Sequence, residues 1–452
     1  MEKKKVAILG AGITGLVTAY YLKKAGIAFR IFEKTRHIGG VIDTREKDGF
    51  VYERGPNSGV IANAETAELF EELGNRCKLE IASASSAKRL IWKEGKWHAL
   101  PSGIVGGITT PLFSLKDKLR LLGEPFRKKG NNPNETLAHL VIRRMGQSFL
   151  DYAIDPFILG IYAGNPDYLV PKYALPKLYR LEQDYGSFIG GAIKKKREKK
   201  SPGEKKVTRE IFSVEGGLQH LTHTLTTILG EENIETGCED IFVIKSGDNF
   251  LVHDKGQQED FSHSVSTVNA GVLPQLFPFV EAKQWQPVTN LVYAKVTEVA
   301  IGFKKWNGIP LDAFGGLIPF KEKRNLLGVL FMSSLFGNRA PEGGALLTTF
   351  VGGTRKPELA ELNGEALYQL VKKELEITMG LENAEPDLFE FATHQQAIAQ
   401  YGADSEARFR AIANIELLHR GLYLAGSIRD GIGLADRIKQ AHFMADDIIL
   451  NA

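Results

Sequence analysis

Three glycines near the N-terminus and one acid downstream have the types and spacing that bind the phosphates and ribose of a dinucleotide. In the segment GAGITG, Gly10 supplies a tight turn, Gly12 lets a pyrophosphate approach the backbone, and Gly15 lets a helix pack closely on a strand. Glu33 can accept hydrogen bonds from both hydroxyls of a ribose, and it would repel a 2′-phosphate. The pattern therefore predicts a site for FAD or NAD and disfavours NADP.

The elements that must position these residues are a strand, a helix and a second strand. The apolar run that ends the segment from Lys3 to Leu9 is typical of a parallel strand buried on both faces. From Ile13 to Lys24 the apolar residues recur at helical spacing, so the first amides and the positive end of the helix dipole would face the phosphates. Gly26 ends this helix, and a second strand, Ala28 to Phe32, then leads into Glu33.

Composition excludes several classes of protein. A chain of 452 residues is long enough for two to three domains, and its formal net charge of +3 makes no case for a nucleic-acid partner. Only Cys77 and Cys238 are present, without a C-x-x-C pair, which predicts neither a disulfide framework nor a redox dithiol and favours a reducing compartment. No long apolar run or signal-peptide pattern is evident, so we expect a cytoplasmic protein that does not span a membrane.

Common hydrolytic and metal-dependent chemistries are also disfavoured. His220 and His223 stand three residues apart, but no third ligand accompanies them, so we predict no metal site. The sequence contains no G-x-S-x-G elbow, H-E-x-x-H motif or Walker-type loop. Redox chemistry remains.

Two further turns follow the first unit. The turn from Arg36 to Gly40 ends in the pair Gly39 and Gly40, whose amides could approach a second set of phosphate or ribitol oxygens. The corner from Gly55 to Ser58, GPNS, would be rigid, with its Asn or Ser capping the helix that follows.

The middle of the chain predicts an inserted helical region, from about Ser86 to Pro202. Its far end is strongly basic, and we interpret it as a solvated, mobile loop: Lys194, Lys195, Lys196, Arg197, Lys199, Lys200, Lys205 and Lys206. The alternative is contact with anionic lipid headgroups, supported by an apolar patch that would insert into the membrane: Ile104, Val105, Ile108, Leu112 and Phe113.

The second half returns to the nucleotide-binding domain twice. A glycine turn and helix after Glu210 lead into alternating strands, and a broad antiparallel sheet is predicted between Thr289 and Gly353, with helices from Glu358 to Met379. The chain returns at Leu422 with a strand, a glycine loop and a helix. We predict an α/β protein in which a discontinuous Rossmann-like domain (1–85, 205–270 and 413–452) accompanies a helical region (86–204) and an antiparallel-sheet substrate domain (271–412).

Taken together, the motifs resemble those of the flavin amine oxidase and protoporphyrinogen oxidase superfamily. Both ends carry the resemblance, through GAGITG with Glu33, the Arg36 to Gly40 turn, and LAGSIRDGIGLADRI. Interior segments are similar to the oxygen-dependent protoporphyrinogen oxidases: RGPNS, RLIWKEGKWHALP, FILGIYAGNPDYL and VEGGLQHL. The resemblance spans nearly the whole chain and implies FAD, not NAD, as the cofactor.

The resemblance also implies which residues form the site. Those expected to hold FAD are Gly10, Ala11, Gly12, Ile13, Thr14, Gly15, Glu33, Lys34, Arg36, Gly39, Gly40, Val41, Gly55, Pro56, Asn57, Ser58, Ile241, Ser427, Ile432, Gly433 and Leu434. Within this set Ile241 would pack on adenine, whereas Ser427 and the Ile432 to Leu434 stretch would lie beside the isoalloxazine. Among substrate contacts, Arg89 would pair with a propionate, and the Gly160 carbonyl would meet the pyrrole N–H groups. Leu317 and Phe350 would sandwich the macrocycle.

The implied reaction is the oxidation of protoporphyrinogen IX to protoporphyrin IX in heme biosynthesis. Six electrons leave in three hydride transfers to flavin N5, and O2 takes them up to give H2O2. No residue is identified as a general base. The alternatives are coproporphyrinogen III as substrate, an amine oxidase or carotenoid desaturase reaction, and a non-catalytic FAD-binding module. The expected partners are the porphyrinogen, O2, an anionic surface at the inner face of the cell membrane, a second copy in a homodimer, and a downstream chelatase that receives the product.

Overall fold

A five-stranded parallel sheet carries the predicted nucleotide-binding unit. The structure is a computed structural model and describes residues 4–101, 106, 109–198 and 202–450. In spatial order the strands are β10 (Ile234–Thr236), β2 (Ala28–Glu33), β1 (Lys5–Leu9), β14 (His263–Ser266) and β20 (Leu422–Leu424). All neighbouring pairs are parallel, so their carboxyl ends meet at one edge of the sheet. The predicted βαβ unit and the return at Leu422 are confirmed.

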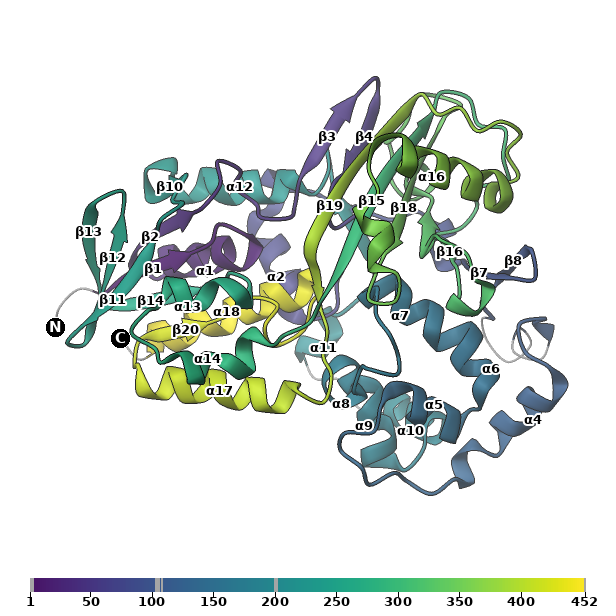
Figure 1. The fold of residues 1–452 in the computed structure, drawn as a ribbon, viewed down its shortest axis with the longest axis horizontal. Helices are drawn as coiled ribbons and strands as arrows, with labels where there is room; N and C mark the ends of the chain where they lie inside the picture. The colour runs from purple at the N-terminus through teal and green to yellow at the C-terminus, as the bar shows by residue number, and fades with distance from the viewer. Residues whose placement is uncertain (1–3, 102–105, 107–108, 199–201, 451–452) are drawn as a thin grey trace.

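Both faces of this sheet are covered, which explains the apolar run in its central strand. Val6 and Ile8 point to one face and pack with α1 (Ile13–Lys24), α12 (Gln219–Leu229) and α18 (Leu434–Leu450). Ala7 and Leu9 point to the other face and share a core with the antiparallel strands β11 (Phe242–Ser246), β12 (Asn249–Asp254) and β13 (Gln257–Phe261), and with α17 (Ser405–Leu418). Figure 1 shows α1 and α18 beside the sheet although they come from opposite ends of the chain. The nucleotide-binding fold is therefore discontinuous, as predicted.

A second sheet of seven strands forms the other large layer. Its order is β19 (Leu388–Ala399), β15 (Tyr293–Phe303), β18 (Ala345–Gly352), β17 (Gly328–Leu330), β16 (Gly315–Leu317), β7 (Arg89–Lys93) and β8 (Lys96–Ala99). All pairs are antiparallel except β16 with β7. α16 (Gly364–Met379) packs on it, and the antiparallel sheet and this helix are both as predicted. The range predicted to be helical from Ser86 thus begins with two strands of this sheet.

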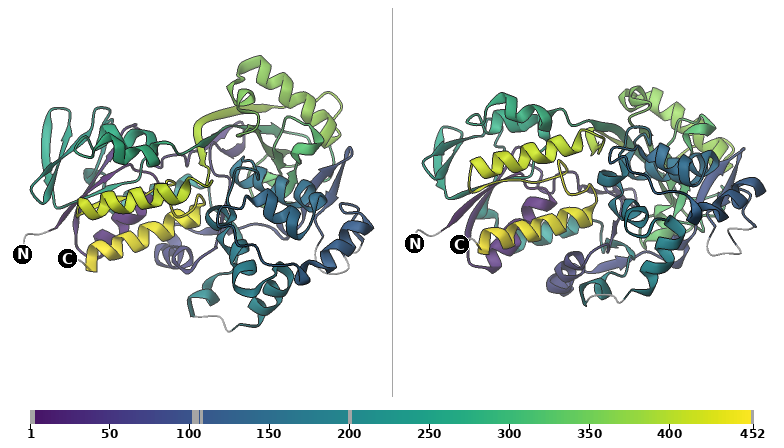
Figure 2. Two further views of the ribbon diagram at one scale, coloured as in Figure 1. Left: turned by 60° about the horizontal axis from the view of Figure 1, so that its bottom comes forward. Right: turned by 90° about the horizontal axis from the view of Figure 1, so that it is seen from below.

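Helices fill the remainder of that range, in the lower right of Figure 1. They are α4 (Leu115–Leu122), α5 (Leu137–Arg144), α6 (Gln147–Phe149), the π-turn η4 (Leu150–Ile154), α7 (Asp155–Tyr162), α8 (Pro171–Ala174), α9 (Pro176–Tyr185) and α10 (Phe188–Arg197). Arg144 is fully buried among them and pairs with Glu124 and Glu182, so the charges neutralise one another inside the bundle. Figure 2 shows α17 and α18 running roughly parallel to each other from the middle of the molecule towards the termini, one on each face of the parallel sheet.

The structure corrects three local expectations. Lys194 to Arg197 form the last turn of α10 instead of a loop, where cations suit the negative end of the helix dipole. Leu112 and Phe113 are buried, and the Phe113 ring stacks on Phe149 with 4.0 Å between centroids, so neither can insert into a membrane. Asn63, not Asn57 or Ser58, caps α2 (Ala64–Leu73).

Some residues of the predicted first strand, apolar patch and basic segment lie outside the described residues. They are Lys3, Ile104, Val105, Ile108, Lys199 and Lys200. In the described part of the chain, no helix combines the length and apolar character needed to cross a membrane. Within the same residues no group of three or more His, Cys, Asp or Glu side chains could hold a metal ion. The division into five segments remains a proposal.

Candidate active site

Two glycine segments lie against each other at the carboxyl edge of the parallel sheet. Gly12 forms a parallel β-bridge with Gly39, whose N–H donates to the carbonyl of Ala11 at 2.9 Å. A Cβ on Gly40 would lie only 3.2 Å from the Cα of Gly12. The two turns predicted to bind phosphate therefore form one continuous backbone surface without side chains.

The start of α1 leaves its amides free for an anion. Gly12 is the N-cap and provides no side-chain cap, and the first turn holds no acid, so the amides from Ile13 to Gly15 can donate to phosphate oxygens. Gly15 is required by packing, because a Cβ there would lie 2.1 Å from the carbonyl oxygen of Gly10.

Glu33 ends β2 beside this turn, as predicted. Its Oε2 accepts a hydrogen bond from Ala11 N at 2.8 Å, and its Oε1 accepts from the amide and hydroxyl of Thr35, each at 3.0 Å. Oε2 keeps a lone pair for a ribose hydroxyl. The amide of Cys238 donates to the Glu33 carbonyl at 3.0 Å, which brings the segment leading to Ile241 alongside. Lys34 and Arg36 are exposed in the loop that follows.

The corner from Gly55 to Ser58 packs directly on the glycine turns. A Cβ on Gly55 would lie 1.8 Å from the carbonyl oxygen of Val41. Asn57 is buried, and its Nδ2 donates to Glu298 Oε1 at 2.6 Å and to the Gly55 carbonyl at 3.2 Å. Its Oδ1 is buried and has no hydrogen-bond partner in the described part of the chain. An orphaned acceptor among the residues expected to hold FAD fits a ligand that donates an N–H.

Buried polar side chains fix the loop before α18. The Tyr401 hydroxyl lies 2.9 Å from the Ser427 carbonyl and 3.0 Å from that of Gly431. Arg437 donates to the Gly431 carbonyl at 2.8 Å, and Arg408 donates to the carbonyl of Ile428 at 3.0 Å. The stretch that contains Ile432 and Gly433, and the start of α18 at Leu434, is therefore held rigidly next to the cavity described below.

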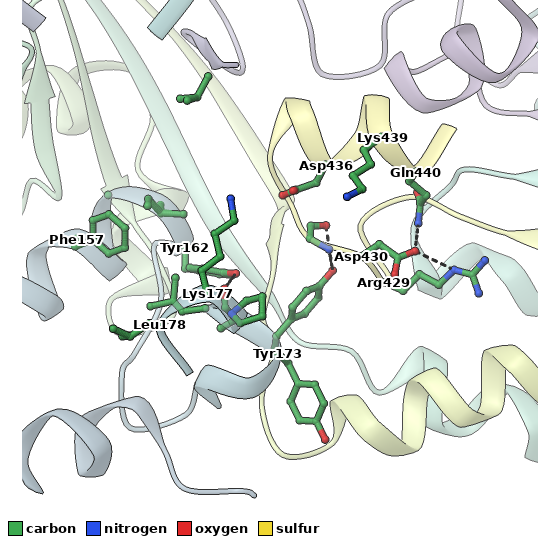
Figure 3. Close-up of a pocket in the computed structure, with 18 of the residues that line it drawn as sticks. Phe157, Tyr162, Tyr173, Lys177, Leu178, Arg429, Asp430, Asp436, Lys439 and Gln440 are labelled. Carbon is green, nitrogen blue, oxygen red and sulfur yellow. Dashed lines mark hydrogen bonds and ion pairs between the residues drawn. The ribbon is translucent and has the colours of Figure 1, made fainter. Parts of the chain in front are cut away.

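One large cavity, of about 2040 Å³, adjoins these residues. Arg89 on β7, Gly160 on α7, Leu317 on β16 and Lys177 on α9 line one part of it. A second part follows α17, β20 and α18, and Figure 3 shows Tyr162 and Lys177 on one side facing Asp436 and Lys439 of α18 on the other. The cavity exceeds the roughly 300–1,000 Å³ of ordinary ligand sites, so it has room for a large planar ligand.

The register of the seven-stranded sheet places four side chains in one row. Ile91 pairs with Leu317, Leu317 with Gly328, Gly328 with Phe350, and Phe350 with Glu298, so all five positions share a face. Strand spacing puts Leu317 and Phe350 about 10 Å apart, with no side chain between them at Gly328. Phe350 packs near Ala163 and is not among the residues that line the cavity, unlike the other three predicted substrate contacts.

Glu298 is an acid buried in the middle of this sheet. Burial raises the pKa of its carboxyl well above the ordinary 4.5, and the neighbouring carboxyl of Glu53 adds to the rise. The hydrogen bond from Asn57 opposes the rise without reversing it. Glu298 is therefore neutral at pH values at which an exposed glutamate is charged, and it fixes Asn57 through an uncharged contact.

We expect the variant Glu298→Gln to change how stability depends on pH. Because the pKa of Glu298 is higher in the folded than in the unfolded protein, wild-type stability decreases as pH rises from about 4.5 towards the folded pKa. Each pH unit in that window corresponds to about 1.4 kcal/mol. The variant keeps the oxygen that accepts from Asn57 but cannot ionise, so it should be more stable than wild type above the window and equal to it below. Thermal unfolding from pH 4 to 9 would measure this, and parallel curves would contradict a neutral Glu298.

Sequence reasoning missed three of the residues that shape this site. Glu298 carries a visible signal, since it is an acid within the apolar segment KVTEVAIGF. Tyr401 and Lys177 carry none, because their roles depend on which loop or cavity they meet after folding. Other predicted FAD residues do come together at one edge of the sheet. They are the first turn, Glu33 and the two glycine corners.

Comparison with known proteins agrees with this arrangement. The family model for flavin-containing amine oxidoreductases matches residues 13–436. The chain therefore belongs to that family, and it is a flavoprotein oxidoreductase whose cofactor is FAD. FAD is one of the two dinucleotides that Glu33 alone left open.

Two relatives and two solved structures place the chain within the family. It is 31% identical over 479 residues to protoporphyrinogen oxidase 2, chloroplastic/mitochondrial, of Arabidopsis thaliana, covering 99% of this chain and 94% of that protein. It is 25% identical over 474 residues to coproporphyrinogen III oxidase of Bacillus subtilis (strain 168), covering 99% and 98%. A crystal structure from Exiguobacterium sp. 255-15, provisionally described as a protoporphyrinogen oxidase, superposes with a TM-score of 0.83 at 24% identity over the whole of both chains. Cyclohexylamine oxidase from Brevibacterium oxydans IH-35A shares the fold, with a TM-score of 0.69 at 14% identity and 99% of each chain covered.

Proposed function

We propose that the protein oxidises a porphyrinogen to the corresponding porphyrin, with O2 as the final electron acceptor. Bound FAD supplies the two-electron chemistry. Loss of six electrons and six protons from the porphyrinogen requires three such rounds, which consume three O2 and release three H2O2. The names of the relatives support this reaction, and Arg89, as a single carboxylate anchor, favours protoporphyrinogen IX.

The charge of the cavity is the observation that carries the proposal. Arg89 lines it without an acidic partner in the described part of the chain, and its guanidinium lies 5.7 Å from the ring of Phe314. Apolar side chains such as Leu317 and Phe157 form much of the remaining wall. A large apolar macrocycle with carboxylate substituents complements this wall. Beside Arg89 a protonated amine would be repelled by the guanidinium, and a polyene would leave this cation without a partner.

Gly160 has the properties that its proposed contact needs. A Cβ there would lie 2.6 Å from Leu317 Cδ2, so a side chain would take space that the ligand needs. α7 ends at Tyr162, and the amide of Gly164, which would be the helix donor to the Gly160 carbonyl, makes no such hydrogen bond in the described part of the chain. The Gly160 carbonyl therefore has no partner from the end of its own helix and can accept from a pyrrole N–H.

Anaerobic mixing tests this function directly. The yellow holoprotein is mixed with protoporphyrinogen IX or coproporphyrinogen III without O2, and flavin absorbance near 450 nm is followed. We expect bleaching on mixing and porphyrin fluorescence with H2O2 on aeration. A flavin that stays oxidised with both substrates, or bleaches only with an amine or a polyene, would refute the proposal.

We also propose a lipid-facing surface, on α4 and not at Leu112 and Phe113. Leu115, Leu119 and Leu122 are 73%, 60% and 71% exposed, and Phe126 is 89% exposed. Their spacing of three and four residues places the leucines on one face, with lysines and arginines between them. Such an amphipathic helix can lie in the headgroup region of an anionic membrane. A homodimer and transfer of product to a chelatase remain predictions.

The double variant Leu119→Asp, Leu122→Asp should lose affinity for anionic vesicles. Burying a leucine is worth about 1.5–3 kcal/mol, so removing two should lower the bound fraction at least tenfold. Flotation with phosphatidylserine-containing liposomes at low salt measures this. Leu418→Asp, at a residue 64% exposed on α17, is the matched control. Equal flotation of both variants and wild type would argue against α4.

A further inference from the structure

Lys177 is one of the cations that line the cavity in addition to Arg89; the others are Lys172, Arg420, Arg429 and Lys439. Lys177 is exposed in the first turn of α9, and Figure 3 shows its ammonium group pointing away from α9 into the space that Asp436 and Lys439 face from α18. In the described part of the chain it makes no ion pair, hydrogen bond or ring contact. Lys172, on α8 in the same wall, is already neutralised, because its Nζ lies 3.6 Å from Glu406.

A cation at this position does not stabilise the folded protein. α9 has no acid in its first turn and no side-chain cap, so Lys177 adds positive charge to the positive end of a helix dipole. Such placement destabilises the start of a helix. An anionic ligand would offset this cost, whereas the folded chain itself does not.

The acid across the cavity is not the partner of Lys177. Asp436 Oδ2 accepts a hydrogen bond from the amide of Gly433 at 3.1 Å, and no ion pair joins it to Lys177. Asp430, which also lines the cavity, accepts from Gln440 Nε2 at 2.8 Å and lies 3.4 Å from Arg429. Asp436 and Asp430 are therefore already held by their own neighbours, as is Glu416, whose Oε2 lies 2.8 Å from Arg429 Nη1.

We propose that Lys177 binds a substrate carboxylate on the edge of the macrocycle opposite to the one that Arg89 holds. Arg89 lies on β7 of the large sheet and Lys177 on α9 of the helical region, so the two cations reach the cavity from different parts of the fold. This proposal rests on the porphyrinogen oxidase function. Protoporphyrinogen IX has propionates on two neighbouring rings and vinyl groups on the other two. Coproporphyrinogen III has one propionate on each ring. A cation at the edge opposite to Arg89 selects coproporphyrinogen III. This reverses the preference for protoporphyrinogen IX that Arg89 alone supports.

Steady-state kinetics on both purified substrates test the assignment. In Lys177→Gln we expect KM for coproporphyrinogen III to rise about tenfold, as loss of one charge-assisted hydrogen bond predicts. KM for protoporphyrinogen IX should change less than about twofold, because a vinyl group would face Lys177. Both kcat values should stay within about twofold. Lys177→Arg should keep the wild-type ratio of the two KM values, and Arg180→Gln, which removes an exposed cation of α9 that does not line the cavity, should leave that ratio unchanged.

The outcomes separate this inference from the function on which it rests. If Lys177→Gln forms porphyrin with an unchanged ratio of KM values, or if both KM values rise equally, Lys177 does not select a carboxylate on the far edge. If wild type forms porphyrin from neither substrate, the proposed function fails instead. FAD absorbance at 450 nm relative to 280 nm, measured for each variant, shows that the fold is intact, and Lys177→Met, which removes the same charge, decides the question if the glutamine variant does not fold.

Discussion

Replacing Gly15 by alanine is expected to yield a protein that purifies without FAD. The added Cβ would lie 2.1 Å from the backbone carbonyl of Gly10, and neither the helix nor the turn can move without displacing the amides that bind phosphate. A clash with backbone cannot be relieved by a rotamer change, so we expect binding at least about 100-fold weaker, equivalent to about 2.7 kcal/mol. The ratio of absorbance at 450 nm to that at 280 nm, and titration of the apoprotein with FAD, would measure this.

Gly26→Asn provides the matched control at the opposite end of α1. Gly26 has φ of +71°, which asparagine tolerates, and no atom lies within 4 Å of an added Cβ. This variant should bind FAD as wild type does. Full FAD occupancy in Gly15→Ala would show that the first turn of α1 does not hold the cofactor.

Replacing Arg89 by alanine is expected to raise KM for either porphyrinogen by about 10- to 100-fold. Hydrogen bonds to charged groups contribute about 1.5–3 kcal/mol, and the guanidinium has no protein carboxylate to which it could otherwise be committed in the described part of the chain. kcat should fall less than KM rises, because Arg89 binds the substrate before the chemical step. Its loss would only loosen the position of the bound substrate. Porphyrin fluorescence under aerobic turnover gives both constants.

Two variants control for charge and for position. Arg89→Lys keeps the charge but loses the planar pair of donors, so its KM should lie between those of wild type and alanine. Lys88→Ala removes the adjacent cation, which pairs with Asp312 at the surface and does not line the cavity, and should leave KM unchanged. Equal KM values for Arg89→Ala and Lys88→Ala would remove Arg89 from the substrate site.

The sequence by itself determined the elements whose cause is local. Gly10, Gly12 and Gly15 define a turn within a few residues, and the helix and strands around it follow from apolar spacing, so the first unit and the position of Glu33 were predictable. The glycine corners at Gly39 and Gly55 were predictable as turns for the same reason. The meeting of the first turn with the Gly39 turn followed from the rule that carboxyl ends of parallel strands meet. The Gly55 corner follows a strand of an antiparallel pair, so tertiary contacts decided its place beside them.

Tertiary structure decided everything that depends on which distant segment a residue meets. β7 and β8 joined the large sheet because β16 offered a partner for Arg89 to Ile91, which no local pattern around Ser86 indicates. Leu112 became core instead of a membrane patch, and Glu298 became neutral, because burial is a property of the packed chain. Lys177 resembles any solvated lysine in the sequence, and only the fold places its ammonium group in a cavity with an arginine from the seven-stranded sheet. The charge or apolarity of a residue is fixed by its type. The groups that it contacts, and therefore its contribution to the free energy of folding or binding, are set by long-range contacts.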